Sequence, residues 1–224
     1  MSEFSVDVSP AFHEIYPHAA VGVMVVEGMS GSLASPALEA ARAQIEAGLR
    51  QRFADKAALR AHPVLQAYKD YYKAFQKTYH VQSQLESVIF NGRSIPSAPA
   101  AVQAMFMAEL DNMLLTAGHD LDKLEPPIHI GIGMHDQSYT LMNGSLQNLK
   151  TNDMCMADGQ GIISSVIYGP DQRTRLSAQT NNAMFVVYAP DGIQTALVAK
   201  HFSDILGTVR LFSPMAGKQF LEIF

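Results

Sequence analysis

The sequence predicts an α+β fold, and three patterns support this class. Helix-like segments occupy residues 36–80 and the part that follows residue 191, and short strand-like segments separated by turn residues cluster between residues 128 and 189. A hydrophobic fraction of 48% over 224 residues is enough for a continuous core. No repeat or linker marks a boundary, so we expect one domain over residues 1–224, with the first strand and helices in 1–85 and the core in 86–224.

The first regular element is the nearly continuous apolar run 20–27, which is typical of a strand buried on both faces. Gly28 and Gly31 are expected to end it. Pro36 suits the first turn of a helix, and apolar residues then recur every three or four positions as far as Phe53. This segment predicts an amphipathic helix of about four turns.

A second helix is predicted over residues 65–79, where leucine and aromatic residues form a stripe of helical period. The His-Pro step at 62–63 separates it from the first helix, since the residue before proline is steered away from helical geometry. Basic residues recur every four positions off this stripe, and they form either a solvated helix face or an RNA-contacting surface. These residues are Lys69, Lys73 and Lys77.

The segment 84–90 is short and mixed in character, and an Asn-Gly turn follows at 91–92. Serines and prolines in 94–99 suit the entry of a helix. Residues 100–115 are apolar on most faces, which predicts a buried helix, and Gly118 is expected to stop it.

A polar stretch, His-Asp-Leu-Asp-Lys at 119–123, is expected to be a turn that joins this helix to a strand over 128–133. Charged side chains beside a core are unfavourable unless they pair or bind something. Two interpretations stay open: Asp120 and Asp122 cap the helix end or pair with Lys123, or the stretch is part of a ligand site.

The remaining elements alternate short strands with turn residues. Strands are predicted over 138–142, 161–168 and 183–189, turns at 143–144, 158–159 and 169–170, and a last helix after 191–192.

Composition limits the class of protein. The formal net charge of −5 argues against binding to nucleic acid by charge alone. The amino terminus has no basic segment followed by an apolar run, and no stretch approaches the roughly 18 apolar residues of a membrane span, so we expect a cytoplasmic protein without membrane association. Cys155 is the single cysteine, which excludes an internal disulfide, and it is either a small buried residue or a reactive thiol.

Several familiar chemistries lack their motifs. The sequence has no phosphate-binding loop, no glycine fingerprint of dinucleotide binding, no His-Glu-x-x-His and no nucleophile elbow. His129 and His135 lie six residues apart in and after a strand, which suits either a metal or two structural or surface histidines. Without a third ligand at a suitable spacing, we expect neither a metal nor a cofactor.

Five short motifs stand in a distinctive order along the chain: Ile95-Pro96-Ser97, Asp120-Leu121-Asp122-Lys123, Met156-Ala157-Asp158, Gly169-Pro170-Asp171, and Thr180-x-Asn182 before the strand 183–189. In this order they resemble the B3/B4 editing domain of the bacterial phenylalanyl-tRNA synthetase beta chain, and more closely the free-standing proteins built from that domain alone. The beginning, residues 12–18 followed by an apolar strand, also looks like the start of the free-standing proteins.

The resemblance implies a three-layer fold, a β-sandwich with helices against it, and a pocket between the layers in residues 86–224. It implies a hydrolase that deacylates mischarged aminoacyl-tRNA in trans by water attack on the ester, with aminoacyl-tRNA as a transient partner. An alternative is a non-catalytic module with the same fold that holds a free amino acid or an RNA end. A third hypothesis gives residues 36–80 a separate role in protein interaction.

The resemblance also places substrate-binding residues at the pocket, with no catalytic residue assigned: His119, Asp171, Thr180, Asn182, Ser164 and Ser165. Asp171 falls where the synthetase has a glutamate that reads the tyrosine hydroxyl, and its shorter side chain leaves the identity of the amino acid open. His119 is two residues nearer to the Asp-Leu-Asp-Lys turn than the synthetase histidine. Asp171, Thr180 and Asn182 are alternatively plain turn residues.

Overall fold

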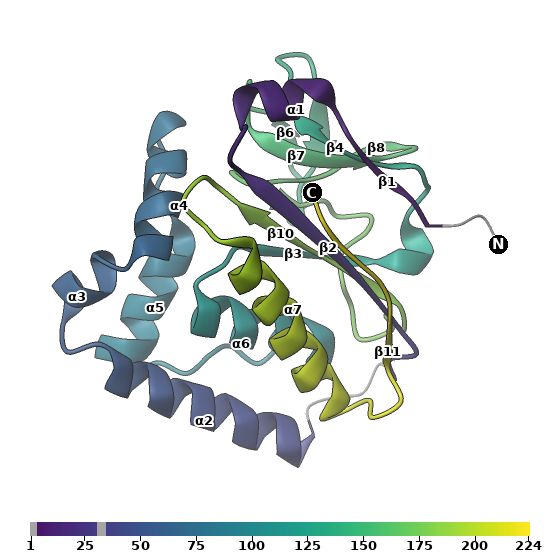
Figure 1. Ribbon diagram of the computed structural model, residues 1–224. Helices are drawn as coiled ribbons and strands as arrows, with labels where there is room; N and C mark the ends of the chain where they lie inside the picture. Colours follow the sequence, from purple (N-terminus) through teal and green to yellow (C-terminus); the bar gives the residue numbers. More distant parts are fainter. Residues whose placement is uncertain (1–3, 31–34) are drawn as a thin grey trace.

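The computed structural model describes residues 4–30 and 35–224 and arranges them in three layers (Figure 1). A layer of helices covers one face of a four-stranded sheet, and a five-stranded sheet packs on the opposite face. The predicted α+β class and its three-layer arrangement are confirmed. Residues 1–3 and the predicted strand end at Gly31 lie outside the described residues.

The four-stranded sheet has the order β11-β2-β10-β3 and is antiparallel throughout. Its strands are β2 (Ala20–Glu27), β3 (Thr116–Asp120), β10 (Ala183–Ala189) and β11 (Gly217–Ile223). The predicted strands 20–27 and 183–189 are confirmed, and β2 is buried on both faces as far as Val26 because helices cover one side and the second sheet the other. β3 therefore forms one edge of this sheet and β11 the other.

The five-stranded sheet has the order β1-β4-β7-β8-β9. Its strands are β1 (Val6–Val8), β4 (Ile128–Ile132), β7 (Met154–Asp158), β8 (Gly161–Ser165) and β9 (Gly169–Pro170). β1 runs parallel to β4, and the other pairs are antiparallel. The short helix α1 (Pro10–Ile15) leads from β1 toward β2, and β5 (Ser138–Thr140) pairs with β6 (Leu146–Asn148) in a separate hairpin.

The helical layer contains α2 (Pro36–Arg52), α3 (Lys56–Arg60), α4 (Pro63–Ala74), α5 (His80–Phe90), α6 (Ala100–Asn112) and α7 (Thr195–Arg210). Ser35 begins α2 as its N-cap, since its Oγ accepts the N–H of Leu38 at 3.1 Å, and Pro36 occupies the first turn. No helix in the described ranges combines the length and apolar character that crossing a membrane requires.

Hydrogen bonds from four buried tyrosine hydroxyls join α4 and the start of α5 to the rest of the core. Each finds a buried acceptor, as hydroxyls in a core must. The four bonds are Tyr68 to the Tyr188 carbonyl (2.6 Å), Tyr71 to Asp153 Oδ1 (2.7 Å), Tyr72 to the Val166 carbonyl (2.8 Å) and Tyr79 to the Met113 carbonyl (3.0 Å). The helical layer is thus joined to both sheets.

Two helix predictions need correction. The predicted helix 65–79 ends at Ala74, because Gln76 adopts a left-handed backbone with φ of 58°, and Tyr79 instead precedes α5. The buried helix predicted over 100–115 ends at Asn112, where Met113 turns the chain with φ of 62°. Gly118 does not stop a helix; it lies in the middle of β3.

The predicted turn at 119–123 is also partly wrong. His119 and Asp120 are the last residues of the buried strand β3, and a single 3-10 turn, Leu121–Lys123, follows. The predicted strand 161–168 ends at Ser165, and 138–142 ends at Thr140. The mixed segment 84–90 belongs to α5, and six strands were not predicted, namely β1, β3, β6, β7, β9 and β11.

Candidate functional site

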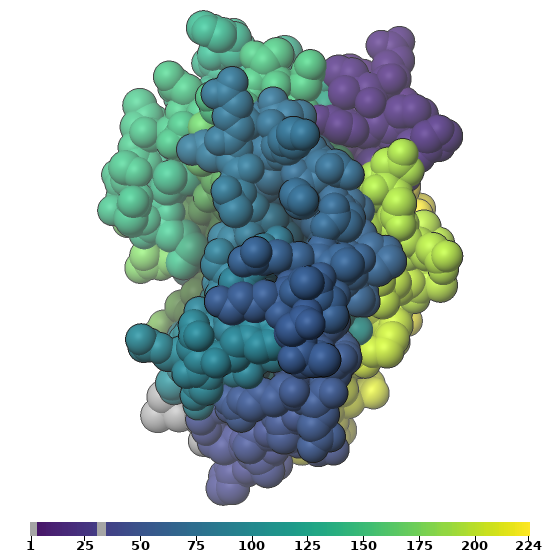
Figure 2. All heavy atoms as spheres, turned by 90° about the vertical axis from the view of Figure 1, so that its left-hand side faces the viewer, coloured from purple at the N-terminus to yellow at the C-terminus, as the bar shows by residue number. Residues whose placement is uncertain are grey.

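A cavity of about 240 Å³ lies at the edge of β3 that faces away from β10, beside the isolated bridge between His119 and Arg175. Helices α5 and α6 border it on one side, and the segment from β8 to residue 176 borders it on the other. Figure 2 shows this face of the molecule, which is hollowed between the green segment that carries β5 and β6 and the teal end of the helical layer. Most of the wall is apolar, and its apolar side chains are Val102, Met105, Phe106, Leu115, Met142 and Leu176.

The backbone of β3 forms one wall of this cavity. The N–H of Thr116 donates to Glu109 Oε2 at 3.0 Å and that of Asp120 donates to the Thr174 carbonyl at 2.6 Å, so alternate N–H groups point away from β10. By this alternation the N–H of Gly118 points to the same edge, where Gly118 lines the cavity. A Cβ atom at this position would collide with Cδ1 of Leu176, so glycine keeps this wall open.

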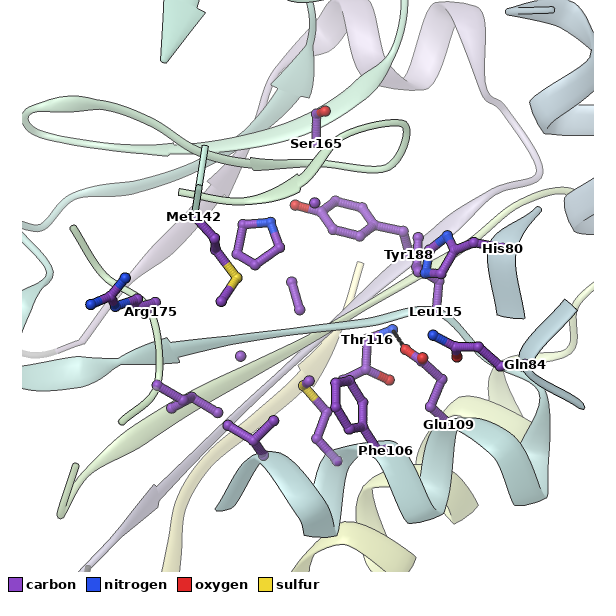
Figure 3. A pocket seen from close by; sticks show the side chains of 17 residues that line it. His80, Gln84, Phe106, Glu109, Leu115, Thr116, Met142, Ser165, Arg175 and Tyr188 are labelled. Carbon is purple, nitrogen blue, oxygen red and sulfur yellow. Dashed lines mark hydrogen bonds between the residues drawn. The ribbon is translucent and has the colours of Figure 1, made fainter. Parts of the chain in front are cut away.

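Glu109 is the buried acid of the cavity wall. It is 3% exposed, and burial raises the pKa of its carboxyl to about 8, although the hydrogen bond from the Thr116 N–H acts in the opposite direction. The carboxyl is therefore protonated at neutral pH. Figure 3 shows the side chain of Gln84 directed toward it from α5. The sequence prediction missed Glu109, and the available signal was an acid inside the apolar segment 100–115, which also contains Asp111.

Arg175 lies at the other end of the cavity wall from Glu109 (Figure 3). Its side chain is exposed, and in the described part of the chain no hydrogen bond or ion pair joins its guanidinium to another residue, while its backbone forms an isolated bridge with His119. In Figure 3, Met142, from the turn between β5 and β6, lies between the two ends, and Pro170 also lines the cavity. The cavity thus has an acidic end and a basic end separated by apolar side chains.

Of the two serines predicted at the pocket, Ser165 lines the cavity. Its Oγ accepts the N–H of Tyr168 at 3.2 Å and lies 3.3 Å from the hydroxyl of Tyr139. Ser164 lies behind the wall, because its Oγ is 2.7 Å from the hydroxyl of Tyr188, which itself lines the cavity.

His119 and Asp171 are connected, but neither lines this cavity. His119 Nδ1 is 2.7 Å from Thr174 Oγ1, and that hydroxyl donates to Asp171 Oδ1. His119 Nδ1 must then be the donor to Thr174, which leaves Nε2 as a buried acceptor without a partner among the described residues. Burial lowers the pKa of His119 to about 3, so the ring is neutral.

Thr180 and Asn182 hold the turn that follows β3. Thr180 Oγ1 donates to Asp120 Oδ2 at 2.8 Å, and Asn182 Nδ2 donates to Asp122 Oδ1 at 3.0 Å. Asp120 also accepts the N–H of Asp122 and lies 3.4 Å from Lys123 Nζ, so the pairing with Lys123 in the first interpretation is present, but at the end of a strand and not at a helix end. The substrate-binding role of Thr180 and Asn182 stays a prediction, and neither residue lines the cavity.

The remaining candidates are structural or exposed. Cys155 is buried, and burial raises the pKa of its thiol to about 12. His129 Nδ1 lies 2.6 Å from Asp7 Oδ1 at the surface, and His135 is exposed. Within residues 4–30 and 35–224, no three side chains of His, Cys, Asp or Glu form a group that could hold a metal ion. Lys69, Lys73 and Lys77 are exposed, as both a solvated helix face and an RNA-contacting surface require.

Comparisons with known proteins place the chain by fold. No family model matches the sequence, and no curated protein matches it either. The structure is similar to that of an N-terminal fragment of the phenylalanyl-tRNA synthetase beta-subunit from Pyrococcus horikoshii, with a TM-score of 0.52 and 12% sequence identity. The match covers 99% of this chain and 50% of that fragment, so the chain spans about half of the fragment. At this identity the similarity concerns the fold.

Proposed function

We propose that this protein hydrolyses the ester of a mischarged aminoacyl-tRNA in trans, with the amino acid in the cavity beside β3. The similarity of fold to a synthetase beta-subunit fragment supports a function related to tRNA. A small cavity with largely apolar walls and a few polar groups is suited to one amino acid. The observation that carries the proposal is the edge of β3 that faces away from β10, where Gly118 lines the cavity and to which the alternation of the strand turns its N–H.

The proposed reaction needs no covalent intermediate with the protein. A water molecule adds to the ester carbonyl carbon, the carbonyl oxygen becomes negative, and the Gly118 N–H stabilises that oxygen. The C–O bond to the ribose then breaks, and the ribose oxygen takes up a proton that the water loses. The products are a free amino acid and a tRNA with a free 3′ end. Ser165 supplies a hydroxyl at the wall that can orient the water.

Arg175 supports the same assignment at the mouth of the cavity. A guanidinium without a protein partner among the described residues suits a phosphate of the tRNA end, since arginine presents several donors to phosphate oxygens. Such a local contact is compatible with a net charge of −5, because a factor that samples tRNA transiently does not need a broad basic surface.

A second candidate is a binding module for an amino acid or an RNA end, without hydrolysis. Glu109 favours this candidate, because a carboxyl that burial keeps protonated at neutral pH cannot accept a proton from water there. His119, the other buried base predicted for the site, does not line the cavity. The two candidates differ in whether the ester is cleaved.

Deacylation of a panel of mischarged tRNAs tests the proposal. We expect release of the amino acid above the uncatalysed rate for at least one member, and a decrease of about tenfold or more on Arg175→Ala, the loss of one charge-assisted contact. Lys218→Ala is the matched control, because it removes one exposed positive charge from β11, at the opposite edge of the sheet. Release at the uncatalysed rate for every tRNA, with folded protein, would contradict hydrolysis, and binding without release would support the second candidate.

A further inference from the structure

The two charged residues of the cavity define the kind of amino acid that it accepts. We propose that the cavity selects an amino acid whose side chain ends in a primary amine, with the amine at Glu109 and the anionic end of the ligand at Arg175. This inference rests on the proposed function, because it names the substrate class of the same site. The chemical class is an amine at the end of an apolar stem, of which lysine is the simplest probe.

The first argument is the incomplete pairing of the Glu109 carboxyl. One hydrogen bond from the described residues ends on it, from the Thr116 N–H to Oε2 at 3.0 Å. A glutamine or a serine could accept the Thr116 N–H equally well, and burying its neutral side chain would cost less free energy than burying a carboxyl. No second hydrogen bond from the described residues ends on this carboxyl, although Gln84 is directed toward it, so the other oxygen, at the cavity wall, can accept a donor of the ligand.

The second argument is the order of groups along the cavity. In Figure 3, Glu109 and Arg175 lie at opposite ends of the side chains that line it, with Met142 between them. Apolar side chains such as Met105, Phe106 and Leu176 supply the walls. A ligand with a positive end, an apolar stem and a negative end matches this order, and a purely apolar side chain would leave the Glu109 carboxyl facing apolar atoms.

The other titratable groups near Glu109 do not oppose a cation at this place. Tyr68, Tyr72 and Tyr79 face the carboxyl from α4 and the start of α5, and burial raises the pKa of each, so all three stay neutral. His80 lines the cavity from α5, and burial lowers its pKa, which keeps it neutral at pH 7 and above. Arg175 is the cation of the cavity wall, and it stands at the other end.

Binding of an amine at Glu109 has a specific consequence for protons. The carboxyl is protonated in the free protein at neutral pH, and an ammonium group beside it favours the ionised form. The protein therefore releases one proton to solvent for each ligand bound at pH 7. The pKa of Glu109 is raised to about 8, and the amine binds the ionised carboxyl. The affinity for the amine should therefore increase about tenfold for each unit by which the pH is raised toward 8, and level off above that value.

Calorimetric titration with L-lysine and L-norleucine provides the test, because norleucine has the same stem as lysine without the amine. We expect lysine to bind at least about tenfold more tightly than norleucine at pH 8, the difference that one buried charged hydrogen bond makes. Titrations at pH 7 in buffers of different ionisation heat should show the release of one proton with lysine and none with norleucine. Glu109→Gln, which can still accept the Thr116 N–H, should abolish both the preference and the proton release.

Each outcome decides the inference separately from the proposed function. Equal binding of the two probes, tighter binding of norleucine, or no binding of either at millimolar concentration overturns it. A preference for lysine that survives in Glu109→Gln also overturns it. Hydrolysis of tRNA esters without a lysine preference would leave the proposed function standing alone, and lysine binding without hydrolysis would leave the inference as the specificity of a binding module.

Discussion

The hydroxyl groups of Tyr188 and Ser164 lie 2.7 Å apart and join the two sheets across their buried interface. Tyr188→Phe would leave the Ser164 hydroxyl without a partner, so we expect the free energy of unfolding to fall by about 1–3 kcal/mol. Urea denaturation measures this change. Replacing both partners, as Tyr188→Phe with Ser164→Ala, should recover part of the loss, because no polar group is then left unpaired. A double variant less stable than the single one would contradict this account.

Gly118→Ala should close part of the cavity. The new methyl group would displace the side chain of Leu176 and press on Met105, and both residues line the cavity. We expect a loss of about 1–3 kcal/mol in stability from overpacking, together with weaker binding and slower deacylation. Denaturation and the tRNA assay measure the two effects.

Gly22→Ala is the control for that variant. Its Cβ would lie 2.6 Å from Phe202 Cε2 on α7, away from the cavity. Stability should fall by a similar amount while the activity of each folded molecule is retained. Equal loss of activity in both variants would show that overpacking of the core, and not closure of the cavity, is the cause.

The titration of Glu109 predicts a dependence of stability on pH. Its folded pKa, about 8, is raised above the ordinary value of 4.5, so the folded state retains a proton that the unfolded chain releases. The free energy of unfolding should therefore fall as pH rises through the window between these two values. Glu109→Gln removes this dependence, and relative to it the wild-type protein should lose about 4 kcal/mol between pH 5 and pH 9. Parallel stability curves for the two proteins would contradict the assignment.

Arg173 and Asp158 form an ion pair with the opposite dependence on pH. Arg173 Nη2 donates to Asp158 Oδ1 at 2.7 Å and to Oδ2 at 2.8 Å. Burial alone would raise the pKa of Asp158, but hydrogen bonds, that of Arg173 first among them, hold it below its ordinary value. The stabilisation is present at neutral pH and is lost as pH falls through that lowered value.

Arg173→Met should therefore destabilise the protein by about 1–2 kcal/mol at pH 7, a figure reduced for the partial exposure of the arginine, and by less at pH 3. Lys56→Met is the control, because its pairing with Glu86 at 3.7 Å is exposed on the lysine side, and it should change stability by less than about 0.5 kcal/mol. A difference between Arg173→Met and wild type that grows at low pH would contradict the sign of this linkage.

The strands that the sequence predicted well are those whose pattern is independent of their partners. β2 and β10 are continuous apolar runs buried on both faces, and that pattern has few alternatives. β3 was not predicted, because the apolar residues before it continue those of α6, and the change from helix to strand at Met113 depends on pairing with β10. β11 has mixed polarity because it is an edge strand, and its burial is low.

The candidate site was predicted in part for a similar reason. Ser165 lines the cavity, where a small residue at the end of a strand is tolerated, and its substrate-binding role stays a prediction. Glu109 was overlooked because a helical pattern is identified by its apolar residues. Its significance comes from burial and from the edge of β3, neither of which is visible in the sequence. His119 was expected at the pocket. Successive residues of β3 face opposite sides of the sheet, so the His119 side chain lies on the side opposite to that of Gly118.

The position of β2 between β10 and β11 has a consequence for biosynthesis. β2 ends at Glu27, whereas its partner strands β10 and β11 begin at Ala183 and Gly217. β2 therefore emerges from the ribosome long before either strand that pairs with it. Loop closure over such separations makes folding slow, and an apolar strand that waits unpaired is prone to aggregate. We therefore expect the nascent chain to require a chaperone until β11 is made, and truncation before β11 to give insoluble protein.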